Sequence, residues 1–296
     1  MAVKLAQALA GVGTDAVVVN ADASQVYADL EILSARPTDD DMGGVPHRLF
    51  GEIDGADTYN AARWADDARD VIAKAHAANI VPILVGGTGL YLRTLLNGIA
   101  PVPEIDPVVR AAVRAMDVGD AHRALAAADP AAAVRFNAAD RTRVARALEV
   151  IQSTGRPLAD WQAAQTGGIA TAIMLTPFIL LPPRDALRTG CDIRLEAMFD
   201  GGAIAEVEAL LARRLDPDLP VMRAIGVPQI ASCLRGEIDR SQALLLAQAA
   251  TRQYAKRQFT WFRNQPPVEW PRHPESLSVD NINEIAIILR DRLLTR

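Results

Sequence analysis

The chain has 296 residues, 50% of them hydrophobic and 23% charged, which is typical of a soluble globular protein with about two domains. Its formal net charge of -5 excludes nucleic-acid binding by a uniformly basic surface, so a nucleic acid would need a local basic patch. The apolar run at 173–181 is shorter than the roughly 20 residues that span a membrane, and the first residues lack a secretory pattern. We therefore expect a cytoplasmic protein that does not enter a membrane.

The first hundred residues alternate between helical and strand patterns. We expect a helix at 3–10 and then a buried strand at 16–19, which ends at the polar cluster 20–25. A helix at 62–78, a strand at 80–85 and a helix at 90–97 follow, with the glycine-rich stretch 86–89 between the last two. Two helix–strand units in succession predict a parallel sheet with helices on both faces.

Three prolines within 101–107 mark a change of pattern. Alanine- and arginine-rich helical periodicity follows them, and the next strand pattern is at 172–181. We therefore expect an all-helical insertion domain at 104–171, between the parts 1–103 and 172–296 of one α/β core domain. The later helices are expected at 184–199, 203–215 and 240–262.

Asp22 and Thr88 are candidates for chemistry because each follows a predicted strand, at the edge where open α/β sheets place ligands. A carboxylate there can act as a general base, bind a metal or cap a helix. The glycine-rich stretch around Thr88 can hold a phosphate through backbone N–H groups, or it can be a tight turn. The residues alone leave these alternatives open.

Two runs carry basic residues in regular patterns. Arg143 and Arg146 share a helix face with room for RNA phosphates, although a solvated, salt-bridged face has the same pattern. Residues 251–263 interleave four basic and four aromatic side chains, which suits either a polyanion site or an amphipathic helix with an aromatic core side. No two His residues have metal-ligand spacing, so we expect no zinc site.

Taken together, these runs resemble the tRNA dimethylallyltransferases. The blocks that carry the resemblance occur in the same order and comprise 20–22, 25–27, 35–37, 45–47, 86–91, 143–150, 222–226 and, most specifically, 251–263. The resemblance implies an α/β fold, in which a P-loop-NTPase-like parallel-sheet core carries an all-helical insertion domain. It implies transfer of a dimethylallyl group from dimethylallyl diphosphate to N6 of adenine 37 in tRNAs that read codons beginning with U. It further implies Mg²⁺ as cofactor, the anticodon stem-loop of tRNA as partner, and a monomer.

The resemblance also implies roles for single residues. Asp22 matches the general base that takes a proton from the adenine amine, and Thr88 matches a hydroxyl beside the reacting centre. Contacts with tRNA are implied for Asp22, Ala23, Ser24, Gln25, Thr88, Arg110, Arg141, Thr142, Arg143, Val144, Ala145 and Arg223. Lys256 and Arg257 are implied to bind the diphosphate, and no metal ligand is identifiable. We expect Asp22, Thr88 and the cationic helix around 251–263 to converge on one site.

The sequence departs from the family in several places. The family's first strand and P-loop, with its lysine and metal-binding hydroxyl, are missing here. Ala23 stands where Ser is usual, which removes a hydroxyl near the base, Ala28 replaces a common basic residue and Val227 a usual tyrosine. One alternative hypothesis is therefore an N-terminally truncated, catalytically impaired tRNA-binding protein. Another is a transferase that acts on free adenine nucleotide, for which the helical insertion would not be needed.

Overall fold

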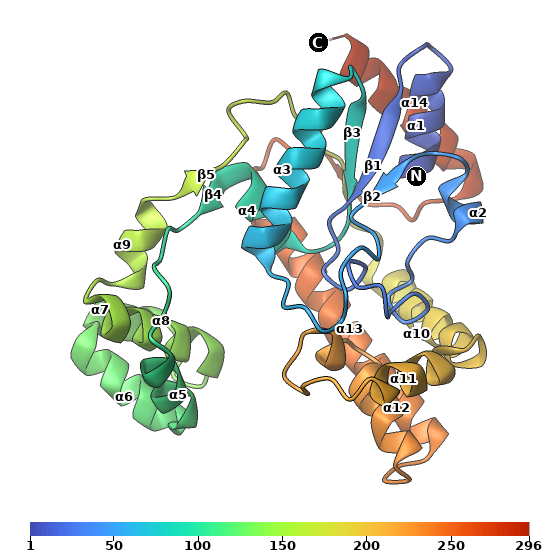
Figure 1. Ribbon diagram of the computed structural model, residues 1–296. Coiled ribbons are helices and arrows are strands. Elements are labelled where there is room, and N and C mark those ends of the chain that lie inside the picture. Colours follow the sequence, from blue (N-terminus) through green and yellow to red (C-terminus); the bar gives the residue numbers. More distant parts are fainter. Residues whose placement is uncertain (296) are drawn as a thin grey trace. The chain divides into compact units, whose positions relative to one another are not determined.

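Three short parallel strands organise the larger part of the chain in the computed structural model (Figure 1). The middle strand, β1 (Ala16–Asn20), pairs with β2 (His47–Arg48) on one side and β3 (Val81–Val85) on the other. All five residues of β1 are buried, as expected of a parallel strand covered on both faces. The register places Asn20 opposite Val85, so the polar residues that follow β1 and β3 emerge at the same edge of the sheet.

The structure describes residues 1–295, which divide into two units. The core unit consists of Met1–Arg93 and Ile173–Arg296, and the helical unit consists of Thr94–Ala172. The helical unit contains the stretch 104–171, for which an insertion was expected, together with the end of α4 (Gly89–Asn97). Among the described residues, no helix is both long and apolar enough to cross a membrane.

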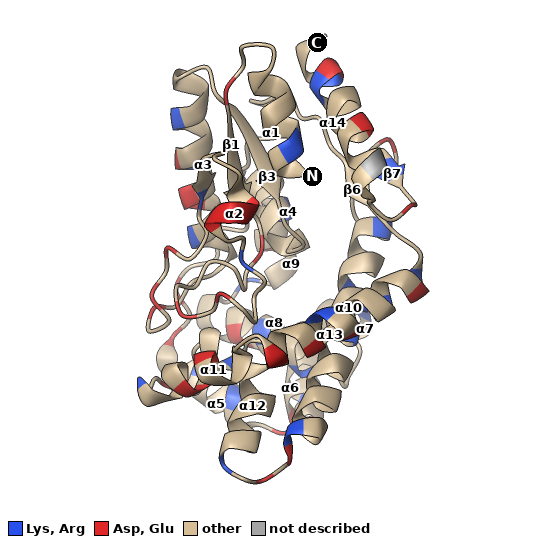
Figure 2. Ribbon diagram, turned by 90° about the vertical axis from the view of Figure 1, so that its right-hand side faces the viewer, with Lys and Arg blue, Asp and Glu red and all other residues tan. Residues whose placement is uncertain are grey.

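Helices cover both faces of the sheet (Figure 2). On one face, α3 (Ala61–Ala77) begins at Asn60, whose side chain accepts the first free N–H groups, and it buries Trp64 against the sheet. On the other face, α1 (Ala2–Ala10) packs against α14 (Val279–Leu294). The core of that layer includes Leu5, Leu9, Ala16, Ala286 and Leu289. Together the two layers bury the apolar strand β1 and make the sheet a rigid base for the loops at its edge.

The remainder of the core unit is mostly helical. Its elements are α2 (Asp39–Met42), α10 (Arg184–Asp200), α11 (Ala203–Ala212), the 3-10 helix η1 (Val221–Arg223), α12 (Val227–Leu234) and α13 (Arg240–Asn264). The strand expected at 172–181 is largely wrong, because only β6 (Ile179–Leu180) is extended there, paired with β7 (Arg272–His273). Pro177 has no N–H to donate, so the apolar run before β6 cannot join a sheet in full.

Five helices and a short ladder make up the helical unit. They are α5 (Pro107–Ala115), α6 (Val118–Ala128), α7 (Pro130–Arg135), α8 (Arg141–Thr154) and α9 (Leu158–Ala163). Their core is lined by Val113, Leu125, Val144 and Leu148. The unit is not purely helical, because β4 (Gly98–Ile99) pairs antiparallel with β5 (Thr166–Gly167) where the chain enters and leaves it. Ladders of two residues have no periodicity that a sequence pattern could reveal.

Candidate active site

The backbone of Asp22 is held by Asn20, the last residue of β1. Asn20 is fully buried, its Oδ1 accepts the Asp22 N–H at 2.8 Å, and its Nδ2 donates to the Asp22 carbonyl at 3.0 Å. The same Nδ2 donates to the Leu49 carbonyl at 2.9 Å, and the indole N–H of Trp64 donates to the Asn20 carbonyl at 2.8 Å. The buried side-chain amide of Asn20 thus has hydrogen-bond partners for both its oxygen and its nitrogen. These bonds fix the direction in which the chain leaves the sheet after β1.

The carboxylate of Asp22 is held by Ser24. Its Oδ1 accepts the Ser24 N–H at 2.8 Å and the Ser24 hydroxyl at 2.6 Å. Ala23 itself has no hydroxyl, as noted from the sequence, but Ser24 places a hydroxyl on the carboxylate from one position further along. Within the described part of the chain, no hydrogen bond to the other oxygen, Oδ2, is found.

Thr88 lies directly beside this loop. Its N–H donates to the Ala21 carbonyl at 3.1 Å, and its Oγ1 accepts the Ala23 N–H at 2.9 Å. Gly86 makes this approach possible, since a Cβ there would lie 2.2 Å from the backbone of Ala21. The Thr88 hydroxyl thus joins two segments, because its oxygen accepts from Ala23 and its side chain also hydrogen-bonds Tyr254.

One face of α13 closes over the glycine-rich stretch. The Gln258 side chain donates to the Gly87 carbonyl at 3.0 Å, and the Trp261 ring lies where a Cβ of Gly89 would be, at 2.2 Å. Tyr254 shares this face, since residues four and seven positions apart on a helix point the same way. Asp22, Thr88 and the helix that contains 251–263, which were expected to converge, thus meet at one edge of the sheet.

Burial raises the pKa of the Tyr254 hydroxyl, and the nearby charge of Asp22 acts in the same direction. Hydrogen bonding from the side chains of Thr88 and Gln258 opposes this rise. Burial likewise raises the pKa of Tyr91, whose ring stacks on Trp64 at a centroid distance of 4.6 Å. These hydroxyls therefore stay protonated at neutral pH, and the site is lined by neutral aromatic rings.

The two cations expected at the diphosphate are placed differently from each other. The Arg257 guanidinium lies 5.5 Å from the centre of the Tyr254 ring, next to the face that covers the glycine-rich stretch. Lys256 is exposed and two residues from Tyr254, which puts it about 200° around the helix. Both side chains are exposed, and Arg257 is the nearer of the two to the helix face of Tyr254 and Gln258.

Sequence reasoning picked out the cations of 251–263 and missed Tyr254 and Gln258 as site residues. The available signal was their spacing of four, which puts them on one helix face. Two other predicted contacts are now located. Gln25 donates to the carbonyls of Ser34 and Ala35 at 3.0 and 2.9 Å, so its amide nitrogen closes its own loop. Arg223 is exposed on η1.

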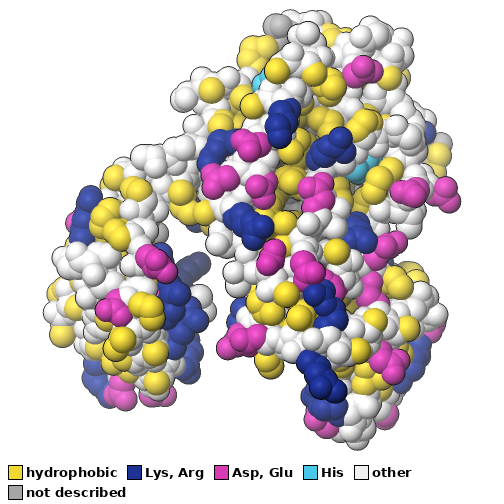
Figure 3. Space-filling model, viewed as in Figure 1, with side chains coloured by type: hydrophobic (Ala, Val, Ile, Leu, Met, Phe, Trp, Pro, Cys, Tyr) yellow, Lys and Arg dark blue, Asp and Glu magenta, His cyan; other side chains and the backbone are white. Residues whose placement is uncertain are grey.

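The helical unit carries its own basic cluster, formed by Arg110, Arg114, Arg141, Arg143 and Arg146 on α5 and α8. Burial lowers the pKa of Arg146, and Arg110 and Arg114 lower it further, while Glu149 opposes them. The buried Glu149 pairs with Arg114 at 3.1 Å, and the guanidinium of Arg141 donates to the Arg114 carbonyl at 2.7 Å. Figure 3 shows Lys and Arg side chains gathered along one side of this unit. Like charges thus lie close together on this part of the unit.

The first residues of α8 were expected to contact tRNA, and they differ in accessibility. Arg141, Thr142 and Arg143 are exposed, and Arg143 lies 3.5 Å from Asp140. Val144 is fully buried in the core of the unit, and Ala145 is partly buried. The side chain of Val144 therefore supports the helix from inside and is out of reach of a ligand.

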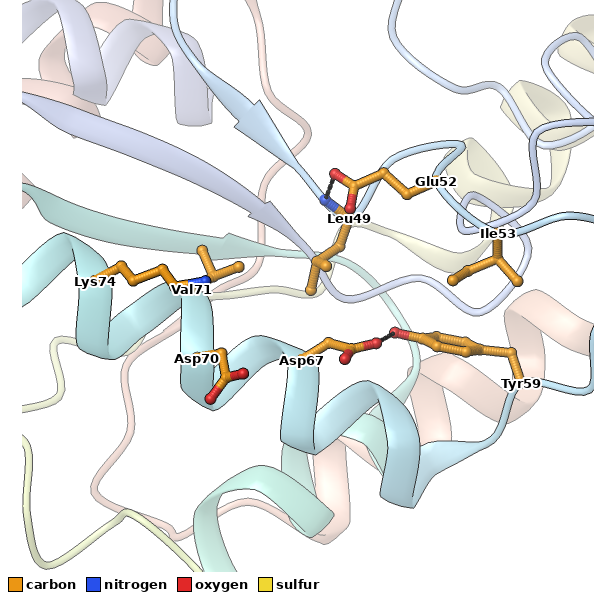
Figure 4. A pocket seen from close by; sticks show the side chains of 8 residues that line it. All are labelled: Leu49, Glu52, Ile53, Tyr59, Asp67, Asp70, Val71 and Lys74. Atoms are coloured by element: carbon orange, nitrogen blue, oxygen red, sulfur yellow. Dashed lines mark hydrogen bonds between the residues drawn. The ribbon is translucent and has the colours of Figure 1, made fainter.

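A cavity of about 270 Å³ lies between α3 and the loop after β2 (Figure 4). It is lined by Leu49, Glu52, Ile53, Tyr59, Asp67, Asp70, Val71 and Lys74. The Tyr59 hydroxyl donates to Asp67 at 2.7 Å, and Glu52 accepts the Leu49 N–H at 2.6 Å. Glu52, Tyr59 and Asp67 thus have hydrogen-bond partners within the protein. The cavity is not bordered by Asp22, Ser24, Thr88, Tyr254 or Gln258.

The fold and the site define an α/β protein of the parallel-sheet, P-loop-NTPase-like class, with a separate helical unit. The model of the IPP transferase family matches residues 25–265. The chain belongs to the IPP transferase family.

Relatives and solved structures agree with this assignment. A protein of Sphingopyxis alaskensis named tRNA dimethylallyltransferase is 72% identical over 296 residues, which cover 100% of this chain and 95% of that protein. One of Novosphingobium aromaticivorans with the same name is 58% identical over 278 residues, 94% of this chain and 99% of that protein. The tRNA isopentenylpyrophosphate transferase of Bacillus halodurans has a TM-score of 0.66 at 28% identity, covering 100% of this chain and 95% of its own.

A eukaryotic dimethylallyltransferase acting on tRNA has a TM-score of 0.71 at 24% identity, covering 88% of this chain and 65% of its own, which is a likeness of fold. These likenesses confirm the fold class expected from the sequence.

Proposed function

We propose that this chain transfers a dimethylallyl group from dimethylallyl diphosphate to N6 of adenine 37 in tRNA. The observation that carries the proposal is the Asp22 carboxylate, which has one oxygen engaged by Ser24 and the other open, in a loop that is hydrogen-bonded to Thr88. The names of close relatives, tRNA dimethylallyltransferase, support the same reaction.

The chemistry requires a proton acceptor and a stabilised leaving group. The N6 lone pair forms a bond to the allylic carbon, while the bond from that carbon to the diphosphate oxygen breaks and its electron pair leaves with diphosphate. The N6 proton passes to Asp22, which acts as general base. The Arg257 guanidinium stabilises the developing negative charge, together with the Thr88 hydroxyl once it turns from Tyr254 to the substrate.

We propose that Mg²⁺ binds together with the diphosphate of the substrate. In the part of the chain that the structure describes, no group of three or more His, Cys, Asp or Glu side chains could hold a metal. A Mg²⁺ ion ordinarily keeps several waters and binds through substrate phosphates with one or two carboxylates. The roles given to Asp22, Thr88 and Arg257 do not depend on the ion.

The arginine cluster of the helical unit is proposed to bind the tRNA backbone near the anticodon. Single-stranded loops are the part of an RNA whose bases can be splayed out and stacked on aromatic rings. The target adenine has to leave its stack to reach Asp22, at a cost of a few kcal/mol. Contacts to phosphates supply affinity for this step without reading sequence.

Replacing Arg143 with Ala tests the contribution of the cluster. We expect weaker tRNA binding and a salt dependence whose log–log slope falls by about 1, because one phosphate contact and its released counterion are lost. Filter binding across a series of salt concentrations measures this slope. Arg235→Ala removes the same charge from a surface pair with Glu237 and is expected to leave the slope unchanged. Equal slopes for all three proteins would remove Arg143 from the interface.

A transfer assay tests the proposed function directly. The purified chain is incubated with dimethylallyl diphosphate, Mg²⁺ and unmodified tRNA, and the digested nucleosides are analysed by mass spectrometry for N6-isopentenyladenosine. Replacing tRNA by AMP separates a tRNA enzyme from one that acts on free nucleotide. Binding of tRNA without product would support the catalytically impaired alternative and contradict the proposal.

A further inference from the structure

The two oxygens of the Asp22 carboxylate have different surroundings. Oδ1 accepts two hydrogen bonds from Ser24, from its N–H at 2.8 Å and from its hydroxyl at 2.6 Å. For Oδ2, no hydrogen bond is found among residues 1–295. A carboxylate offers about four lone-pair sites, so two donors on one oxygen leave the other as the open acceptor.

The hydrogen bonds also fix where that open oxygen lies. Asn20 holds the N–H and the carbonyl of Asp22, so the backbone cannot turn. Ser24 holds the side chain by one oxygen, so the carboxylate cannot rotate freely about its terminal torsion, which is otherwise soft. Thr88, whose oxygen accepts the neighbouring Ala23 N–H, is thereby kept at a constant place relative to Asp22.

We propose that Ser24 is a positioning residue that reserves Oδ2 of Asp22 as the acceptor of the adenine N6 proton; this rests on the proposed transferase function. The proton moves from nitrogen to Oδ2, and the electrons of the broken N–H bond stay on nitrogen. The Ser24 hydroxyl keeps its own proton and its hydrogen bond to Oδ1. Its hydroxyl thus faces the carboxylate instead of contacting tRNA.

Steady-state kinetics of Ser24→Ala test this role. We expect kcat to fall roughly tenfold, because a loosened base spends less time in the reactive geometry. The KM for tRNA and for dimethylallyl diphosphate should stay within about twofold, because the hydroxyl does not contact either substrate. Ser24→Thr keeps the hydroxyl and should restore most of kcat. Ser24→Cys, a weaker donor, should lie between them and serves if Ser24→Ala does not fold.

Ser34→Ala is the matched control. The Ser34 hydroxyl donates to the Leu30 carbonyl at 2.7 Å in the same loop, away from the Asp22 carboxylate. Its removal is expected to lower thermal stability slightly and to leave kcat unchanged. If Ser24→Ala behaves like Ser34→Ala, the role of Ser24 is structural alone and the proposal fails. An increase in the KM for tRNA with kcat unchanged would make Ser24 a tRNA contact and overturn it as well.

A spectroscopic measurement tests, independently of catalysis, whether the Ser24 hydroxyl is hydrogen-bonded to the Asp22 carboxylate. In protein labelled with carboxyl-¹³C aspartate, Asp22→Asn identifies the Asp22 resonance. At one fixed pH, this resonance is expected to move in Ser24→Ala and to stay in place in Ser34→Ala. An unmoved resonance in both would show that Ser24 does not hold the carboxylate. If the unaltered protein transfers no dimethylallyl group, the proposed function fails, and this resonance still tells whether Ser24 holds Asp22.

Discussion

Replacing Asp22 with Asn is expected to lower kcat at least a hundredfold while tRNA binding stays within about twofold. General bases contribute roughly 10²- to 10⁴-fold to such reactions, and an amide in place of Oδ2 cannot take the proton. The amide oxygen can still accept both hydrogen bonds from Ser24, so the loop should keep its structure. The change thus removes the proton acceptor Oδ2 and keeps the hydrogen bonds that Ser24 donates to Oδ1.

Single-turnover transfer and filter binding of tRNA measure the two expectations separately. Asp70→Asn is the control, because Asp70 is an exposed carboxylate on α3 that lines the cavity of Figure 4 and does not border the Asp22 site. It removes the same charge and should leave both the rate and the affinity unchanged. A loss of binding as large as the loss of rate in Asp22→Asn would contradict the role of Asp22 as a base.

The general positions of Asp22 and Thr88 were predictable because the pattern of a buried parallel strand is strong. Both strands lie within a residue of the expected bounds, and the carboxyl ends of parallel strands share one edge. Arg143 was predictable as an exposed cation from helical spacing. The sequence does not specify how the loop after β1 folds back, and that turn brings the hydroxyl of Ser24 onto Asp22.

Contacts between segments far apart in the chain could also not be predicted from the sequence. Gln258 and Gly87 are 171 residues apart, and their hydrogen bond depends on how α13 crosses the glycine-rich stretch. Val144 was predicted to contact tRNA as part of a basic run, and its side chain lies in the core of the helical unit, which helical spacing could have indicated. The short strand β4 was missed for a simpler reason: two residues form no pattern, and tertiary contacts decide whether they pair.

Gly86→Ala is expected to lower the free energy of unfolding by about 3 kcal/mol or more and to reduce transfer as well. A Cβ at residue 86 would lie 2.2 Å from the Ala21 carbonyl carbon and 2.7 Å from the Asp22 nitrogen, so backbone must move. Overpacking at an ordinary core site costs about 1 to 3 kcal/mol, and here no side chain can rotate away. The displaced segment carries Asp22, so its distance from Thr88 should change too.

Urea unfolding and kcat of the same preparations test this expectation, with Gly190→Ala as the control. Gly190 is exposed on α10, and a Cβ there meets nothing within 4 Å. Alanine should stabilise that helix by roughly 0.5 to 1 kcal/mol and leave transfer unchanged. If Gly86→Ala kept the stability and kcat of the unaltered protein, the ends of β1 and β3 would not be in close contact. The pairing of the Asp22 loop with Thr88, on which the proposed chemistry depends, would then need another explanation.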